Sequence, residues 1–461
     1  MTETDPIRLS ATALAAEIAQ GRRSAVAVME AFLDRIDTVN PKVNAIVSRV
    51  DRAALMAEAR EHDAILTQSG PIGPLHGLPM AVKDLEDVTG RPTTQGSPLF
   101  RDSIAQADSP MVARLRQAGV IFIGKTNVPE FGLGSHTYNP VFGPTLNAYD
   151  HHRTAGGSSG GAAVALATHM VPLADGSDHA GSLRNPAAFN NIYGLRPSFG
   201  RVAGEASDIF AATLGVLGPM GRSVEDLALL FSVQAGPDPR MPLSIQQTGA
   251  SITEPLDVPV VGRRIGWLGD LGGYLAMEPG ILPLCEAGLR AIEGLGCVVE
   301  PVALGFPMEE LWEAWTLLRS WGVASSLGDA YRDPKRRDLL KPAAQWEIAR
   351  GMNVSGAAVA QALAVRSRFF LHMLSLFEHY DHLVLPTAQV FPFPADWDWP
   401  KDIADRAMDT YHRWMEVVIL ATNAQLPSLS VPVGFNSAGL PMGMQIMGRH
   451  RSELSVLQLG H

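Results

Sequence analysis

The sequence predicts an α/β fold, a mixed β-sheet core covered by helices on both faces. From Leu75, short apolar runs alternate with helical stretches and glycines. Glycine and proline number 44 and 33 of 461 residues without a collagen-like period. Only 18% of the residues are charged, which is too few for a disordered chain. We expect a single domain over residues 1–461.

A helical preface is predicted over residues 1–66. Ser10 and Ser24 are candidate N-caps, because their hydroxyls can accept free backbone N–H groups at a helix start. Gly21 is expected to end the first helix, and Asn40-Pro41 to end the second.

Residues 75–235 are predicted to form the core. Strands are expected at 78–82 and 120–123, where apolar residues run together. Helices are expected at 109–118 and 224–234, so strands alternate with helices as in a largely parallel or mixed sheet.

A further strand is predicted at 258–262, and residues of about 300–400 are predicted to form a variable helical substrate region. Within it, residues 306–380 suggest long helices, whereas the prolines of residues 389–400 predict a loop. Both parts are rich in aromatic residues. Core packing is the favoured account of the helical aromatics over a substrate tunnel, and for the loop a binding surface and packing on the protein remain equal alternatives.

Composition excludes several classes of protein. The chain carries 37 Lys+Arg against 47 Asp+Glu, a net charge of −10, which argues against nucleic-acid binding. Cys285 and Cys297 are too few for a disulfide framework, and residues 1–6 lack the features of a signal peptide. No apolar run has the length of a membrane span. We expect a cytoplasmic protein that does not contact membranes.

Two motifs match known patterns without the context these patterns need. Gly119–Thr126 has the spelling of a phosphate-binding loop, but Val120–Ile123 are themselves the expected strand, so Lys125 is interpreted as a structural or solvated residue. Gly157–Gly161 has the spelling of a nucleophile elbow with Ser159 as nucleophile. An elbow follows a strand, and the preceding residues 149–155 are polar and turn-like.

A constellation in three pieces predicts the functional site. Lys83 ends an apolar strand, and Gly156–Gly161 leads directly into a helix of small residues. The third piece, Asp175–Ala187, is predicted to be a glycine-containing turn that presents one hydroxyl.

At these residues the sequence closely resembles the amidase signature family. Ser158 lies in a Gly-Gly-Ser-Ser-Gly-Gly loop, Ser182 follows 24 residues later, and Lys83 stands in a Gly-x-Pro-x-x-Val-Lys-Asp context. The resemblance covers nearly the whole chain and includes Gly124–Asn127, Pro129–Glu130, Gly194–Pro197, Gly218–Asp226, Tyr380–Asp381, Leu385–Thr387 and Gly439–Gln445.

The resemblance implies the amidase signature fold and a Ser-cisSer-Lys triad. Ser182 would be the nucleophile, Ser158 a proton relay after a cis Gly157–Ser158 bond, and Lys83 the base. A lysine serves as base only when neutral, which burial favours. No cofactor and no metal is expected.

The backbone N–H groups of the run before the nucleophile are implied as the oxyanion hole: His179, Ala180, Gly181 and Ser182. Ala180 replaces the family's usual glycine, as an alanine does in the family's nylon-oligomer cyclic-dimer hydrolases, so a methyl group is expected toward the pocket or its wall. His179 is expected to pack beside the turn, with contact to substrate the less favoured alternative.

Four residues are expected to support the loops rather than to react: Gly157, Ser159, Asp178 and Arg184. Asp178 and Arg184 flank the turn and are expected to pair with each other, which would hold its shape.

The predicted activity is hydrolysis of a small-molecule amide, carbamate or ester through an acyl-enzyme. Aryl acylamides or urethanes are favoured over small aliphatic amides, because the helical region and the loop are rich in Trp and Phe. Two alternatives remain: one component of a tRNA-dependent amidotransferase, and an α/β-hydrolase-type esterase that uses Ser159. A homodimer is one open assembly, and the resemblance implies a final helix that extends beyond His461.

Overall fold

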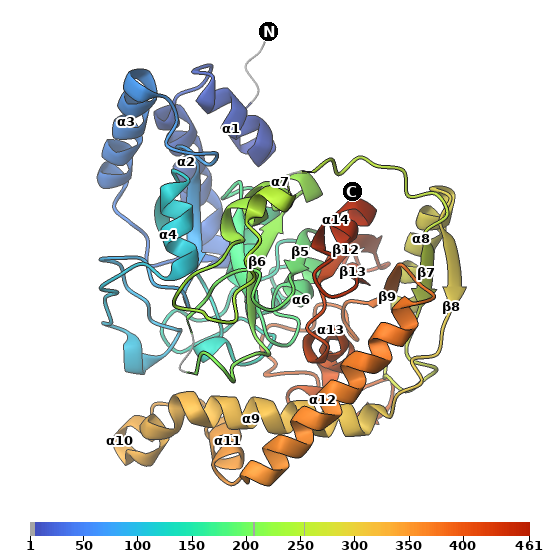
Figure 1. Ribbon diagram of the computed structural model, residues 1–461. Coiled ribbons are helices and arrows are strands. Elements are labelled where there is room, and N and C mark those ends of the chain that lie inside the picture. Colours follow the sequence, from blue (N-terminus) through green and yellow to red (C-terminus); the bar gives the residue numbers. More distant parts are fainter. Residues whose placement is uncertain (1–4, 206–207, 253) are drawn as a thin grey trace.

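The computed structural model describes residues 5–205, 208–252 and 254–461, and its centre is a mixed eight-stranded sheet (Figure 1). The strand order is β4-β6-β5-β12-β13-β9-β7-β8. Its strands are β4 (Ala174–Asp178), β5 (Tyr193–Arg196), β6 (Val216–Gly221), β7 (Arg264–Trp267), β8 (Val298–Pro301), β9 (His382–Pro386), β12 (Ser428–Phe435) and β13 (Pro441–Met447). Among the described residues of this sheet, β7 pairs in parallel with β8 and β9, and the other neighbouring strands are antiparallel. The predicted mixed α/β fold is confirmed.

A second sheet of three strands carries Lys83. Its order is β1-β3-β2, with the bounds β1 (Ile46–Val47), β2 (Pro79–Lys83) and β3 (Ile121–Thr126). β2 ends at Lys83 and lies beside β4 of the larger sheet. The chain segments that hold Lys83 and Ser182 therefore meet where the two sheets approach each other.

The N-terminal segment contains three helices, α1 (Ala11–Ala19), α2 (Ala25–Val43) and α3 (Arg52–Ser69). The predicted N-caps are confirmed, because Ser10 accepts the N–H of the third residue after it at 3.1 Å and Ser24 does the same at 3.0 Å. The helical preface predicted over 1–66 is interrupted between α2 and α3 by β1, which pairs with β3.

The second helix does not end at Asn40-Pro41. It continues to Val43, because a proline in the last turn removes only one helical hydrogen bond. Asn44, with φ of 51°, ends the helix in the left-handed conformation.

The core region contains α4 (Pro110–Gln117), α5 (Gly160–Ala167), α6 (Arg184–Phe189) and α7 (Val224–Gln234), which confirms the helices predicted at 109–118 and 224–234. The strand predicted at 258–262 is wrong. Pro259 has no N–H to donate to a sheet, the chain turns through the hydrogen bond from Arg263 N–H to Val260 O, and β7 begins only at Arg264.

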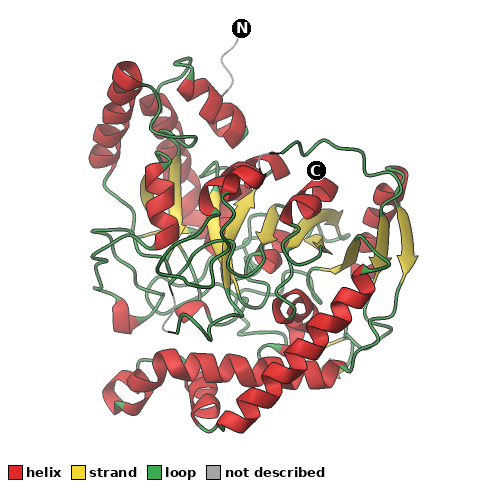
Figure 2. Cartoon of the chain, in the orientation of Figure 1, coloured by secondary structure: helices red, strands yellow, loops and turns green. Residues whose placement is uncertain are grey.

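The second half of the chain has the predicted long helices: α9 (Met308–Arg332), α10 (Pro334–Arg337), α11 (Pro342–Met352) and α12 (Gly356–Phe377). Figure 2 shows α9 and α12 as long helices along one side of the molecule, away from α1–α3. The loop predicted over 389–400 is confirmed as part of a loop over 387–400, and the strand β9 lies between α12 and this loop.

Shorter elements complete the fold. They are the helices α8 (Ile281–Gly294), α13 (Ile419–Asn423) and α14 (Glu453–Gly460), the pair β10 (Asp402–Ile403) and β11 (Arg406–Ala407), and 3-10 turns at Pro6–Arg8, Pro98–Phe100, Glu130–Gly132, Gly249–Ile252 and Arg413–Val418. Within the described ranges, no helix combines the length and the apolar character that crossing a membrane requires. The cytoplasmic location stays a prediction.

Aromatic residues of the second half mostly pack in the core. Trp312 and Trp315 are buried there, and so are Phe391 and Phe393 of the 387–400 loop. Trp397 is the exception in that loop, with half of its surface exposed. The loop therefore packs on its own protein along most of its length.

Candidate active site

Lys83 is fully buried at the end of β2 and is surrounded by hydroxyl groups. Its Nζ lies 2.8 Å from Ser158 Oγ, 2.8 Å from Ser159 Oγ and 2.9 Å from Ser177 Oγ. Burial lowers the pKa of Lys83 to about 7, although the charge of Asp175 acts to raise it. A substantial neutral fraction of Lys83 is therefore present at neutral pH.

The glycine-serine loop before α5 is held from both sides. The peptide bond from Gly157 to Ser158 is cis. Ser135 Oγ donates to Gly157 O at 2.6 Å, and Thr137 Oγ1 donates to Gly156 O at 2.7 Å. Gly156 has φ of 71°, a conformation that side chains disfavour. Small residues and fixed carbonyls thus hold the Ser158 hydroxyl at the lysine.

Asp178 organises the turn that leads from β4 to α6. Its carboxylate accepts the N–H of Gly181 at 2.9 Å and of Leu183 at 3.3 Å. Arg184 donates from Nε and Nη2 at 2.9 and 3.0 Å, which is the predicted pairing, and Arg196 donates from Nη1 at 3.3 Å. Burial alone would raise the pKa of Asp178, but the two guanidinium groups outweigh it and hold this pKa below its ordinary value.

Ser182 lies in this turn with 6% of its surface exposed, and it lines the same cavity as Ser158 and Ser177. Its carbonyl accepts the N–H of Ser159 at 3.2 Å, which ties the two serine loops together. Among the described residues, no hydrogen bond joins the Ser182 and Ser158 hydroxyls. The structure thus brings Lys83, Ser158 and Ser182 together, with direct contact between the first two.

The backbone donors around Ser182 are not equivalent. The Gly181 N–H is already engaged by Asp178, whereas the N–H groups of Ala180 and Ser182 make no hydrogen bond to any residue that the structure describes. Ala180 is buried in the main hydrophobic core and does not line the cavity. The expectation that its methyl group points toward the pocket or its wall is therefore wrong.

The cavity in front of Ser182 has a volume of about 780 Å³. Its walls come from residues 199–205 and 208–217, from the middle of α9 and from α12. The aromatic side chains that line it are Phe131, Phe199, Phe210 and Trp321. The cavity is large enough for a drug-sized molecule and is partly aromatic.

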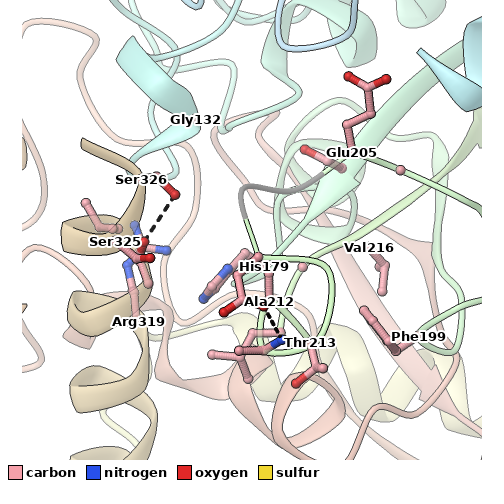
Figure 3. A pocket seen from close by; sticks show the side chains of 18 of the residues that line it. Gly132, His179, Phe199, Glu205, Ala212, Thr213, Val216, Arg319, Ser325 and Ser326 are labelled. Atoms are coloured by element: carbon pink, nitrogen blue, oxygen red, sulfur yellow. Dashed lines mark hydrogen bonds between the residues drawn. The ribbon is translucent and has the colours of Figure 1, made fainter. Parts of the chain in front are cut away.

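His179 contributes its ring to the cavity, where it points between Arg319 of α9 and Thr213 of the 208–217 segment (Figure 3). Burial, followed by the charge of Arg319, lowers the pKa of His179 to about 3, so the ring is neutral at physiological pH. Its Nε2 is buried and has no hydrogen-bond partner among the described residues.

Several residues of the site are not indicated by the sequence motifs. Ser177 and Asp175 lie in the same short run as Ser182, so their closeness in sequence could have indicated that they belong to the site. Arg196 and the residues of the cavity walls are not close to Ser182 in this way. Of the aromatics considered as a tunnel, only Trp321 lines the cavity, and the 389–400 loop does not reach it.

The two rejected motifs have structural roles. Lys125 is buried within β3, where its Nζ donates to Glu86 O and, at 3.1 Å, to Thr93 Oγ1. The residues that match the phosphate-loop pattern therefore form a strand, as predicted, and not a phosphate-binding loop. No strand ends immediately before Ser159, which is fully buried and does not line the cavity. Within the described part of the chain, no cluster of His, Cys, Asp and Glu could hold a metal ion.

Known proteins are similar to this chain over nearly its whole length. A family model described as Amidase matches residues 27–457. An acylamidase of Rhodococcus erythropolis is 35% identical, with 99% of this chain and 95% of the relative covered. A glutamyl-tRNA(Gln) amidotransferase subunit of Salinispora tropica is 34% identical, with 96% and 94% covered.

Solved structures agree with these relatives. A bacterial aryl acylamidase of the amidase signature family superimposes with a TM-score of 0.91 at 28% identity, covering 98% of this chain and 95% of the other. A 6-aminohexanoate cyclic dimer hydrolase in complex with substrate has a TM-score of 0.85 at 25% identity, covering 98% and 96%.

Proposed function

The chain belongs to the amidase signature family, and from this premise we propose that it hydrolyses amide or carbamate bonds through an acyl-enzyme on Ser182. The observation that carries the proposal is the buried Lys83 Nζ, 2.8 Å from the Oγ of Ser158, which lines the same cavity as Ser182. A base, a relay hydroxyl and a second hydroxyl that faces the cavity are the parts that acyl transfer needs.

In the first half-reaction, neutral Lys83 takes the Ser158 proton while Ser158 takes the proton of Ser182. The Ser182 Oγ bonds to the substrate carbonyl carbon, and the π electrons of the carbonyl move to its oxygen. The hydrogen bond between Ser182 and Ser158 forms when substrate is bound, since catalytic hydrogen bonds often tighten only in the complex.

The resulting oxyanion needs donors that are already in place. The Ser182 N–H is the proposed donor, because Ser182 lines the cavity, whereas Ala180 does not line it and the Gly181 N–H is engaged by Asp178. Collapse of the intermediate breaks the C–N bond, and the proton returns from Lys83 through Ser158 to the leaving nitrogen. Water then repeats the sequence on the acyl-enzyme and releases the acid.

An aryl or bulky apolar substrate is the proposed class. Phe131, Phe199 and Trp321 line the cavity, and aromatic walls favour ring-shaped groups. The names of the similar acylamidase and aryl acylamidase support this class. The aromatic residues of the 389–400 loop do not support this class, because the loop lies outside the cavity lining.

A panel of p-nitroanilides, aryl carbamates and primary amides tests this function. We expect release of arylamine together with an acyl adduct on the Ser182 peptide, seen by mass spectrometry after rapid acid quench. An adduct on another residue, or no turnover of any anilide or carbamate, would contradict the proposal.

A second candidate is the transfer reaction of a tRNA-dependent amidotransferase. The observation that favours it is the similarity to glutamyl-tRNA(Gln) amidotransferase subunits from several bacteria, at 30–34% identity over 94–98% of the chain. Glutaminase activity that requires charged tRNA and added partner proteins would support this candidate. Robust hydrolysis of anilides by the isolated chain would favour the hydrolase.

A further inference from the structure

Arg366 on α12 places a buried positive charge at the wall of the active-site cavity. Only 8% of its surface is exposed. Its Nε donates to Asn423 O at 3.3 Å and its Nη1 donates to Thr213 Oγ1 at 3.1 Å. Among the described residues, Nη2 has no acceptor and no carboxylate forms an ion pair with this guanidinium.

The acidic side chains that line the same cavity contact other partners than Arg366. Glu205 lies 3.9 Å from Arg240. Asp208 accepts two backbone N–H groups of its own loop, each at 3.0 Å. Glu86 accepts the Ser109 hydroxyl at 2.9 Å. None of these carboxylates neutralises Arg366.

Arg366 differs from three other buried arginines, which each pair with a carboxylate. Arg319 lies 2.7 Å from Glu347, and Arg184 and Arg196 share Asp178. Burial lowers the pKa of Arg366 to about 10, with no acidic group acting against it. A charge taken out of water without a partner is costly, and an arginine retains its charge at neutral pH.

We propose that Arg366 binds a carboxylate group carried by the substrate, so that the preferred substrates are anionic amides or carbamates with an otherwise apolar body. The guanidinium suits a carboxylate, because its charged N–H groups donate strong hydrogen bonds to carboxylate oxygens. Thr213 orients the guanidinium through Nη1, and Nη2 is left for the ligand. This inference rests on the proposed amide hydrolysis and names its substrate class.

The test compares matched substrates that differ only in the charge. Glutaryl p-nitroanilide is paired with its methyl ester to place the carboxylate on the acyl side. 4-Acetamidobenzoate is paired with its methyl ester to place it on the leaving group. We expect kcat/KM to favour the anionic member of one pair by about tenfold to a hundredfold, the range of a charge-assisted hydrogen bond.

The variant Arg366→Met is expected to bring this ratio close to one, while Arg366→Lys keeps part of it. Thr213→Val, which removes the orienting hydroxyl, is expected to reduce the ratio without changing the charge. Arg368→Met is the matched control, since Arg368 lies on the same helix but is exposed and contacts Glu310. A ratio that Arg366→Met does not change would assign Arg366 to structure alone and overturn the inference.

A binding measurement separates this inference from the proposed reaction. Glutarate and 4-acetamidobenzoate are titrated against the full-length Ser182→Ala variant, and the thermal shift is followed. We expect stabilisation that disappears when Arg366→Met is added. If no amide is hydrolysed but this shift is found, the proposed function fails and the carboxylate site stands. If amides are hydrolysed and neither probe binds, the carboxylate site fails alone.

Discussion

The carboxylate of Asp175 accepts the backbone N–H of Lys83, with its two oxygens 3.1 and 3.3 Å from the nitrogen. Both residues are fully buried. Asp175 belongs to β4 of the large sheet and Lys83 to β2 of the small one, so this contact joins the two sheets at the base of the lysine side chain. Asp175 therefore positions Lys83, and its charge also influences the lysine pKa.

The pH profile of hydrolysis is expected to have its acid limb at Lys83. Below its pKa of about 7 the Nζ is protonated and cannot take a proton, so kcat/KM should rise with pH through this value and then level off. The measurement is kcat/KM for a neutral anilide from about pH 5 to about pH 9. His179 adds no step in this range because its pKa is lowered to about 3. A profile without a limb near neutrality would contradict the assignment of the base.

The variant Asp175→Asn is expected to move that limb to lower pH. The amide oxygen can still accept the Lys83 N–H, but the negative charge that raises the lysine pKa is lost, so the shift should be on the order of one unit. Burial raises the pKa of Asp175 itself to about 6, so the wild-type limb belongs to both groups together. Asp329→Asn, at an exposed position, serves as the control. An unmoved limb would mean that Asp175 acts through position only.

The serine variants separate the two possible nucleophiles. Ser182→Ala is expected to lower kcat by about a thousandfold or more, because the bond-forming oxygen is gone. Ser159→Ala removes one of three hydroxyls around Lys83 and should cost about tenfold or less. Steady-state rates and the acyl adduct are measured for both variants. The reverse order of effects would support an esterase that uses Ser159.

Asp178→Asn is expected to destabilise the protein, because it leaves the buried guanidinium groups of Arg184 and Arg196 without a counter-charge. The free energy of unfolding should fall by about 3–5 kcal/mol. Asp34→Asn breaks an exposed ion pair with Arg52 and should cost less than about 1 kcal/mol. Urea denaturation compares the two, and equal losses would refute a central role for Asp178.

Local patterns explain which parts of this site were predictable from the sequence. Lys83 ends an apolar run, and the Asp178–Arg184 pair spans six positions of a single turn, so the contacts follow from neighbours along the chain. Arg196 is brought to Asp178 by β5, which pairs with β6 and β12 of the large sheet. A contact that depends on the order of strands in a sheet cannot be predicted from the spacing of residues along the sequence.

The cavity walls were beyond prediction for the same reason. The segments 199–205 and 208–217 meet α9 and α12 in front of Ser182, so the walls come from parts of the chain that are far apart in the sequence. Trp315 and Trp321 are both tryptophans of α9, yet the first is buried in the core and the second lines the cavity. The helical period alone does not show which of the two tryptophans faces the core and which faces the cavity. Arg366 belongs to no sequence motif that would indicate its position.

Gly161, the second residue of α5, packs directly against two backbone segments. A Cβ on Gly161 would lie 2.3 Å from Asn127 N and 2.6 Å from Ala45 O, both backbone atoms that cannot yield cheaply. Gly161→Ala should therefore lower the free energy of unfolding by about 1–3 kcal/mol and reduce activity, since α5 and the serines before it must shift. Gly322→Ala on α9 meets no atom within 4 Å and should stabilise by about 0.5–1 kcal/mol. Denaturation curves of both variants decide the point, because equal stability for Gly161→Ala and wild type would mean that close backbone approach does not fix this loop.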